Sequence, residues 1–321
     1  MDISRKRILV TGGSGVIGRY LTHLLEAKGS VVHVFDKIGK SNDFSPSGGY
    51  TRINMAKGTY EKVISKFEPD VIFHLAATFE RSEESSGFWG QNFQDNVCLT
   101  HRLLSALSKM EIDIRLVFGS SYLIYDPALF LRANPTEPAF GLKENSPVNP
   151  RNLCGAAKYY NEREILFISG KFPGISSVSA RIFRVYGEGS RDVISRWIRN
   201  AITDKPLTVF HKENQFDYIF AEDVAEALIR LSVSNARNSV VNVGRGIPIA
   251  ISKVVDTISS HFPDIDIRET DCGGAFEKSH ADIGLLKKLT NWRPNISVED
   301  GIDRIVNYEK RRKRIDDDHA T

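Results

Sequence analysis

Cysteine is scarce in this sequence, with only 3 residues in 321, at positions 98, 154 and 272. Their number is odd and they lie far apart, without the spacing of a metal site. We therefore expect reduced thiols, no bound metal and a cytoplasmic protein. Long apolar runs are also absent, so we expect neither a signal sequence nor a membrane span or membrane partner. The formal net charge of +3 is too small to indicate a nucleic-acid partner.

A glycine-rich turn stands near the start of the chain. Residues 8–10 are apolar and predict a strand, residues 12–18 carry the glycines, and the apolar pattern after them predicts a helix. Gly12 permits a tight turn, Gly15 leaves room for a pyrophosphate against the backbone, and Gly18 lets the helix pack on the strand. The amino end of the helix supplies N–H donors and a positive partial charge for phosphate. This combination predicts a dinucleotide-binding site.

An acidic residue follows at the distance that such a site requires. Asp36 ends the apolar run 31–35, about 20 residues after the glycines, where a carboxylate can accept from both hydroxyls of an adenosine ribose. Its charge would repel a 2′-phosphate, so we predict NAD rather than NADP as the cofactor. Lys37, directly after it, weakens that preference.

Strand and helix patterns alternate along the first half of the chain. Continuous apolar runs such as 70–77 are typical of parallel strands buried on both faces. We predict an α/β fold with a Rossmann-type, doubly wound parallel sheet over residues 1–183 and a smaller C-terminal α/β substrate-binding lobe over 184–321. Segments around 218–243 are candidates for a return to the first domain. We expect the loop 262–280 to close on substrate.

These stretches together resemble the extended short-chain dehydrogenase/reductase family, the NAD-dependent sugar-nucleotide epimerases and dehydratases. The resemblance covers nearly the whole chain, and it rests on the order and spacing of short motifs rather than on one of them. They are residues 12–18, Asp36, 74–77, Asn96, 120–125, 143–147, 152–162, 181–187, 223–225, 242–244, 291–294 and 299–301.

In that family a Ser or Thr, a Tyr and a Lys carry the chemistry, with the Tyr and the Lys four residues apart on one helix. The resemblance maps the Ser to Ser121 and the Lys to Lys158, whereas Cys154 stands at the tyrosine position. It implies that the Lys holds the nicotinamide ribose, that the Ser binds the reacting oxygen, and that hydride passes between a sugar carbon and NAD.

Cys154 leaves three alternatives open. A thiol ionises more readily than a phenol, with reference pKa values of about 8.5 and about 10, and the nearby Lys158 favours its ionisation further. The thiol is also shorter, so it would need a water or a repositioned substrate. Cys154 is therefore the acid/base group itself, or a filler residue while Tyr122 carries the proton, or a sign that redox chemistry is lost. Tyr122 and Leu123 lack the carboxylates that follow this Ser in 4,6-dehydratases, which disfavours that reaction.

The expected substrate residues also depart from the family pattern. Arg184 replaces an Asn, while Phe216 and Cys272 stand where the resemblance places two diphosphate-binding arginines. Either Arg184, helped by Lys278 or Arg191, binds a diphosphate, or the substrate is not a nucleotide sugar.

The resemblance thus implies an epimerase/dehydratase-type enzyme that transiently oxidises a hydroxyl of a sugar nucleotide. The alternatives are a net sugar dehydrogenase or ketosugar reductase, and a catalytically impaired NAD-binding or regulatory protein. It also implies a homodimer through a four-helix bundle of the helices holding 96–109 and 152–168. Expected cofactor contacts are Gly12, Gly15, Val16, Ile17, Gly18, Asp36, Lys37, Asn54, Met55, Leu75, Ala76, Ala77, Asn96, Ser120 and Lys158. Expected substrate contacts are Thr78, Glu80, Arg81, Ser121, Tyr122, Arg184, Arg191, Phe216 and Lys278.

Overall fold

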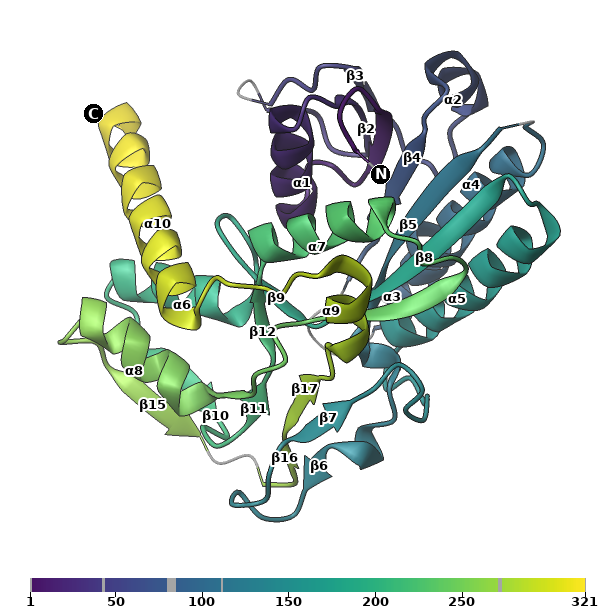
Figure 1. The fold of residues 1–321 in the computed structure, drawn as a ribbon. Helices are drawn as coiled ribbons and strands as arrows, with labels where there is room; N and C mark the ends of the chain where they lie inside the picture. Colours follow the sequence, from purple (N-terminus) through teal and green to yellow (C-terminus); the bar gives the residue numbers. More distant parts are fainter. Residues whose placement is uncertain (1, 42–43, 80–84, 111, 271–272, 321) are drawn as a thin grey trace.

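A seven-stranded sheet forms the centre of the computed structural model, which describes residues 2–41, 44–79, 85–110, 112–270 and 273–320 (Figure 1). The strand order is β13-β8-β5-β4-β1-β2-β3, and every neighbouring pair is parallel. This confirms the predicted doubly wound α/β fold. The strands are β1 Arg7–Thr11, β2 Val31–Asp36, β3 Gly49–Arg52, β4 Val71–His74, β5 Ile114–Ser121, β8 Ile175–Ile182 and β13 Ser239–Val243.

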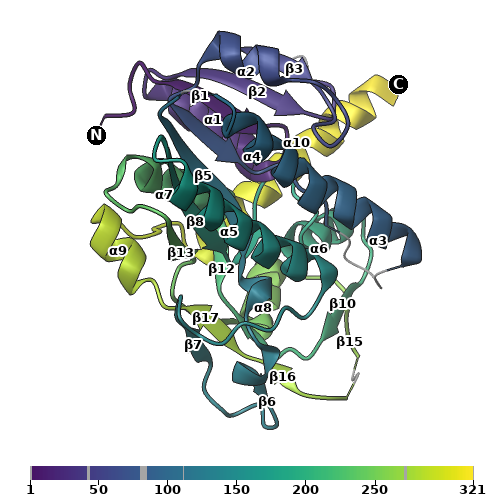
Figure 2. The ribbon, with the colours of Figure 1, turned by 90° about the vertical axis from the view of Figure 1, so that its right-hand side faces the viewer.

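Helices cover both faces of this sheet because its strands are apolar on both sides. In β1, Ile8 and Val10 belong to one buried cluster and Leu9 to another, as the alternation of side chains along a strand requires. The first cluster includes side chains of α1 (Val16–Ala27) and α7 (Ala221–Val233). The second includes side chains of α2 (Glu61–Phe67), α4 (Leu99–Leu107) and α5 (Leu153–Lys171). Figure 2 shows α4 and α5 side by side on their face.

The chain reverses its direction across the sheet between β3 and β4. From β1 it moves outward to β2 and β3, then returns to β4 on the other side of β1. In open parallel sheets, ligands bind at such a switch point, outside the carboxyl ends of the strands. The carboxyl ends of β1, β2 and β4 are therefore the expected position of the cofactor.

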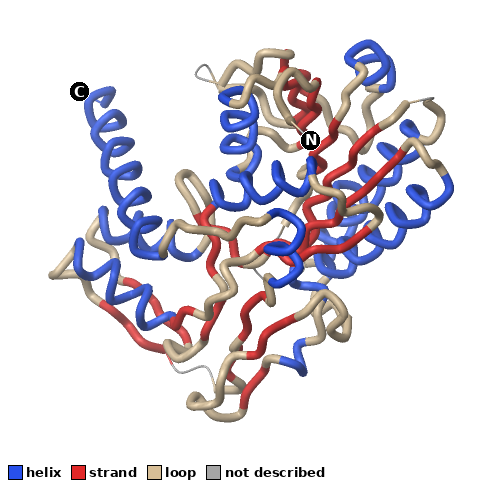
Figure 3. The backbone as a smooth tube through the Cα atoms, viewed as in Figure 1, coloured by secondary structure: helices blue, strands red, loops and turns tan. Residues whose placement is uncertain are grey.

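Most of the remaining elements build a smaller lobe (Figure 3). A separate cluster of buried side chains lies in this lobe. β13 pairs with β8, so residues 239–243 lie in the main sheet although they follow this lobe's first elements. The α-helices not yet named are α3 Ser86–Asn92, α6 Val193–Ile202, α8 Ile251–His261, α9 Gly284–Thr290 and α10 Val298–Ala320. The short strands pair as β6 Leu131–Arg132 with β16 Phe276–Glu277, β7 Phe140–Leu142 with β17 Ser279–Ala281, β9 Arg184–Tyr186 with β12 Tyr218–Phe220, β10 Leu207–Phe210 with β15 Ile267–Thr270, and β11 Gln215–Phe216 with β14 Ile249–Ala250.

The segment 262–280 is not the continuous loop that we expected, because β15, β16 and part of β17 lie in it. Each of these strands pairs with a distant strand, so backbone hydrogen bonds hold the segment to the lobe. Within the described residues, no helix is long and apolar enough to cross a membrane.

Candidate cofactor and catalytic site

The glycine turn between β1 and α1 leaves the amino end of a helix open for an anion. Gly12 has a φ of +75°, and a Cβ there would lie 2.7 Å from the Ala76 nitrogen, so only glycine fits. A Cβ on Gly18 would overlap the Gly12 carbonyl oxygen. Gly15 is the N-cap of α1, and no side chain of the described residues caps that end. The first N–H groups of α1 are thus available to a phosphate.

A groove of about 770 Å³ runs from this turn along the carboxyl ends of β1, β2 and β4. This volume lies in the range of cofactor sites. Most of the predicted cofactor residues line it, namely Gly12, Gly15, Val16, Asp36, Lys37, Asn54, Met55, Leu75, Ala76 and Ala77. Ile17, Gly18, Asn96, Ser120 and Lys158 do not. The prediction missed Ser14, Arg19, Phe35, Ile38, Ile53, Phe79, Gln91, Asp95, Leu99, Gly189 and Ser190, most of which are neighbours of predicted residues.

The acid at the end of β2 is positioned for a ribose. Asp36 is 9% exposed, and its two carboxylate oxygens accept from the N–H groups of Ser14 (2.9 Å) and Ile38 (3.0 Å). Each oxygen keeps a lone pair for a ribose hydroxyl. Lys37 forms an ion pair with Asp95 at 2.8 Å, so its charge is already balanced and does not favour a 2′-phosphate. The residues present fit NAD.

Asn96 holds the loop after β4 rather than capping a helix. It is 2% exposed and lies in a π-helical segment, Phe93–Cys98, between α3 and α4. Its Oδ1 accepts from the Thr78 N–H at 2.7 Å, and its Nδ2 donates to the Thr78 carbonyl at 3.0 Å. Thr78, predicted as a substrate contact, lines the cofactor groove. Asn96 therefore fixes the backbone of Thr78 beside the cofactor groove.

Cys154 and Lys158 lie one turn apart at the start of α5, where the Asn152 side chain caps the helix. The Cys154 Sγ is buried, 3.5 Å from the Thr78 carbonyl oxygen and 3.9 Å from Asn96 Nδ2. The Lys158 ammonium donates to the Gly119 carbonyl at 2.6 Å. Burial lowers the pKa of Lys158 to about 8, although nearby Cys154 and Glu162 oppose that change.

The two serines at the end of β5 point in opposite directions. Ser121 Oγ is half-buried and accepts from the Leu123 N–H at 3.2 Å. Ser120 is buried and donates to the Glu162 carboxylate at 2.5 Å, and Glu162 is paired with Arg181 at 2.8 Å. Alternation along the strand thus turns the Ser120 side chain toward the protein interior, and the predicted cofactor contact of this residue stays a prediction.

A cluster of aromatic and charged side chains surrounds Tyr122. Its ring stacks on Phe183, with centroids 5.2 Å apart, and its hydroxyl accepts from Arg151 at 3.0 Å. Glu277 forms ion pairs with both Arg151 (2.8 Å) and Arg184 (3.2 Å). Burial raises the pKa of Tyr122, although both arginines oppose this change. Burial also raises the pKa of Glu277, but the arginines more than offset it, so that carboxyl stays ionised.

Sequence reasoning predicted only part of this cluster. Arg184 and Phe216 meet in it, with the guanidinium 3.5 Å from the ring centroid. Arg151 and Glu277 were not predicted from the sequence. The position of Arg151, three residues before Cys154, could have indicated that it lies near the site.

Several predicted substrate residues lie elsewhere. Lys278 is 1% exposed, and its ammonium donates to the carbonyls of Pro135 and Glu137, so its predicted substrate contact is wrong. Because successive side chains of an extended segment point to opposite sides, Lys278 faces away from the cluster that contains Glu277. Arg191 lines the cofactor groove instead of joining Arg184. Glu80, Arg81 and Cys272 are outside the described residues. Among those described, no group of His, Cys, Asp or Glu could hold a metal ion.

Comparison with known proteins agrees with this geometry. Residues 8–244 match the model of the NAD dependent epimerase/dehydratase family. The chain is 28% identical over 320 residues to a putative UDP-glucose 4-epimerase of Methanocaldococcus jannaschii, covering 96% of this chain and 99% of that protein.

Two solved structures show the same fold. One is a UDP-glucose 4-epimerase of Thermotoga maritima with UDP-glucose (TM-score 0.83, 22% identity, 95% of this chain and 99% of that one). The other is a UDP-glucuronic acid 4-epimerase of Bacillus cereus in complex with NAD (TM-score 0.79, 21% identity, 95% of this chain and 98% of that one). Because the family model matches more than half of its residues, this chain belongs to the NAD-dependent epimerase/dehydratase family.

Proposed function

We propose that this protein is an NAD-dependent epimerase-type enzyme that acts on a nucleotide sugar by transient oxidation of a sugar hydroxyl. The observation that carries the proposal is the position of Cys154 and Lys158, one helical turn apart behind Thr78, which lines the cofactor groove. A site that only stored NAD would not need an ammonium and a thiol there.

Bound NAD supplies a hydride acceptor that returns the hydride within one cycle. The turn at Gly12 and Gly15 would hold its pyrophosphate, and Asp36 its adenosine ribose. Lys158 would bind the nicotinamide ribose, and Ser121 the reacting sugar oxygen. These roles follow from the resemblance and from the open groups that each residue presents in this structure.

Cys154 is the better candidate for the group that takes the proton. Tyr122 is buried, its hydroxyl already accepts from Arg151, and its raised pKa keeps the phenol protonated at neutral pH. Cys154 receives the Asn96 amide as a donor and lies in the first turn of α5, where the helix dipole favours negative charge. We propose that the Cys154 thiolate takes the proton of the sugar hydroxyl, directly or through a water, and that Tyr122 contacts substrate.

The substrate anion would bind at the arginine cluster. Arg151 and Arg184 present two guanidinium groups to one shared carboxylate, Glu277, and their side chains are 25% and 31% exposed. A diphosphate carries more negative charge than one carboxylate and matches guanidinium geometry. We propose that these two arginines bind the diphosphate in place of the family's usual residues.

Conversion of UDP-sugars, followed by chromatography of the product sugars, tests this assignment. We expect Cys154→Ala to lower kcat at least about 100-fold, as removal of a general base does. Tyr122→Phe should retain kcat within about tenfold, because it keeps the ring. NAD content should be unchanged in both variants. The reverse pattern, with Tyr122→Phe inactive and Cys154→Ala active, would assign the proton to Tyr122.

We also propose a homodimer through α4 and α5. Three large side chains of this region are exposed, Phe93 (54%), Tyr160 (50%) and Phe167 (67%). Large apolar side chains that are exposed in a single chain are candidates for burial in an interface.

A further inference from the structure

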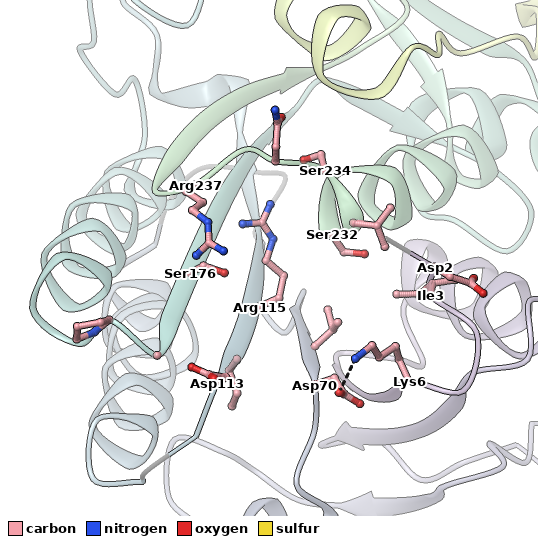
Figure 4. Close-up of a pocket in the computed structure, with 16 residues that line it drawn as sticks. Asp2, Ile3, Lys6, Asp70, Asp113, Arg115, Ser176, Ser232, Ser234 and Arg237 are labelled. Atoms are coloured by element: carbon pink, nitrogen blue, oxygen red, sulfur yellow. Dashed lines mark hydrogen bonds and ion pairs between the residues drawn. The ribbon is translucent and has the colours of Figure 1, made fainter.

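A second cavity lies at the amino ends of the strands, at the opposite end of the sheet from the cofactor groove. Its volume is about 670 Å³, and it is lined by the starts of β4, β5 and β8 and by the segment after α7 (Figure 4). Because all of these strands are parallel, their amino ends are far from the carboxyl ends that hold the glycine turn. The cavity therefore belongs neither to the cofactor groove nor to the cluster around Tyr122.

Two arginines face each other in this cavity. Figure 4 shows the guanidinium groups of Arg115, from β5, and Arg237, from the segment before β13, side by side, with Ser176 next to Arg237. Arg115 donates to the Leu231 carbonyl through Nη2 at 2.8 Å, while its Nε is buried and has no hydrogen-bond partner. Burial and the neighbouring charge of Arg237 lower the pKa of Arg115 to about 10.

No carboxylate balances this pair. Within the described part of the chain, neither Arg115 nor Arg237 has an acidic oxygen within 4.0 Å. Three of the described acids line the cavity, and two of them have other partners: Asp70 is paired with Lys6 at 2.9 Å, and Asp2 accepts from the Ser4 N–H at 3.0 Å. Asp113 lies toward the other end of the Arg115 side chain in Figure 4.

Two like charges held together, one of them half-buried, repel each other, and an anion between them would remove this repulsion. Arginine forks match the oxygens of a phosphate group in charge and geometry. The cavity is also large enough for a mononucleotide. We infer that Arg115 and Arg237 form a binding site for a phosphate group, either as free phosphate or as the phosphate of a nucleotide. This inference is independent of the proposed function, because the site lies at the amino ends of the strands and the cofactor groove lies at their carboxyl ends.

Calorimetric titration of the NAD-saturated protein with inorganic phosphate tests the inference, since bound NAD occupies the glycine turn. Arg237→Gln removes one guanidinium at an exposed position, so folding should be retained. Arg115→Lys keeps the charge and a donor for Leu231 but loses the fork. Arg196→Gln, at an exposed position on α6, removes the same charge elsewhere and is the matched control.

We expect the unmodified protein and Arg196→Gln to bind phosphate alike, and both cavity variants to bind at least tenfold more weakly. A parallel titration with AMP distinguishes the two sources of phosphate. If AMP binds more tightly than inorganic phosphate and is weakened by the same variants, the ligand is a nucleotide. If AMP does not bind, the ligand is free phosphate. Failure of the unmodified protein to bind either probe, or equal affinities of Arg237→Gln and Arg196→Gln, would overturn the inference.

Discussion

Replacing Lys158 with methionine should stabilise the NAD-free protein while abolishing its activity. Folding lowers the pKa of this lysine from 10.5 to about 8, and each pKa unit corresponds to 1.36 kcal/mol. The cost of the buried charge is therefore at most about 3 kcal/mol, an upper limit because the residue is only half-buried. Loss of the hydrogen bond to the Gly119 carbonyl offsets about 1 kcal/mol of the stability gained by removing the buried charge. We expect a net gain of about 2 kcal/mol in the free energy of unfolding near pH 7.

Urea unfolding of the two proteins at several pH values measures this difference. The cost of the buried charge is fully present below the folded pKa of about 8 and fades as pH rises toward the unfolded value of 10.5. The advantage of Lys158→Met over the unmodified protein should thus shrink by about 2 kcal/mol between about pH 7 and about pH 9.5. Lys171→Met, on the exposed end of the same helix, is the control and should show no such trend. An advantage that is absent near pH 7, or that does not change with pH, would show that the buried charge of Lys158 does not destabilise the folded protein.

Two further predictions concern the glycine turn and the proposed interface. Gly15→Ala should keep the unfolding free energy within about 1 kcal/mol, since its Cβ meets only the Gly12 oxygen at 3.2 Å, yet weaken NAD binding at least about tenfold in a fluorescence titration. Gly18→Ala should instead lower the melting temperature, because its Cβ overlaps backbone, and equal melting of the two variants would contradict this. Phe167→Glu should give a monomer by light scattering, whereas Phe210→Glu, exposed in the other lobe, should not; a dimer that survives Phe167→Glu would argue against the α4–α5 interface.

The fold and the cofactor site were predictable because their signals are local. The glycine turn, the acid at the end of β2 and the buried strands can each be recognised in a short stretch of the sequence. The groove at the switch point then follows from the topology of any parallel doubly wound sheet. The ion pair between Lys37 and Asp95 is an exception, because Asp95 lies much later in the chain and no local pattern connects the two residues.

The cluster around Tyr122 was only partly predictable. Strand alternation turns Ser120 and Lys278 away from the site, and that rule could have been applied to the sequence. Arg151 and Glu277 are different, because one lies before α5 and the other on β16, and no local pattern brings them together. Their meeting is set by how the smaller lobe folds over the sheet, which spacing along the chain does not encode.

We propose that NAD bound at the glycine turn would accept a hydride from a nucleotide sugar and return it within one cycle. The most direct measurement is the absorbance of reduced nicotinamide after rapid mixing of the NAD-loaded protein with UDP-glucose, UDP-glucuronate or UDP-N-acetylglucosamine in single turnover. We expect the absorbance to rise and decay with at least one of these sugars, and Cys154→Ala to prevent the rise. NAD that stays oxidised with all three sugars would contradict the proposed hydride transfer and favour a protein that binds the cofactor without using it.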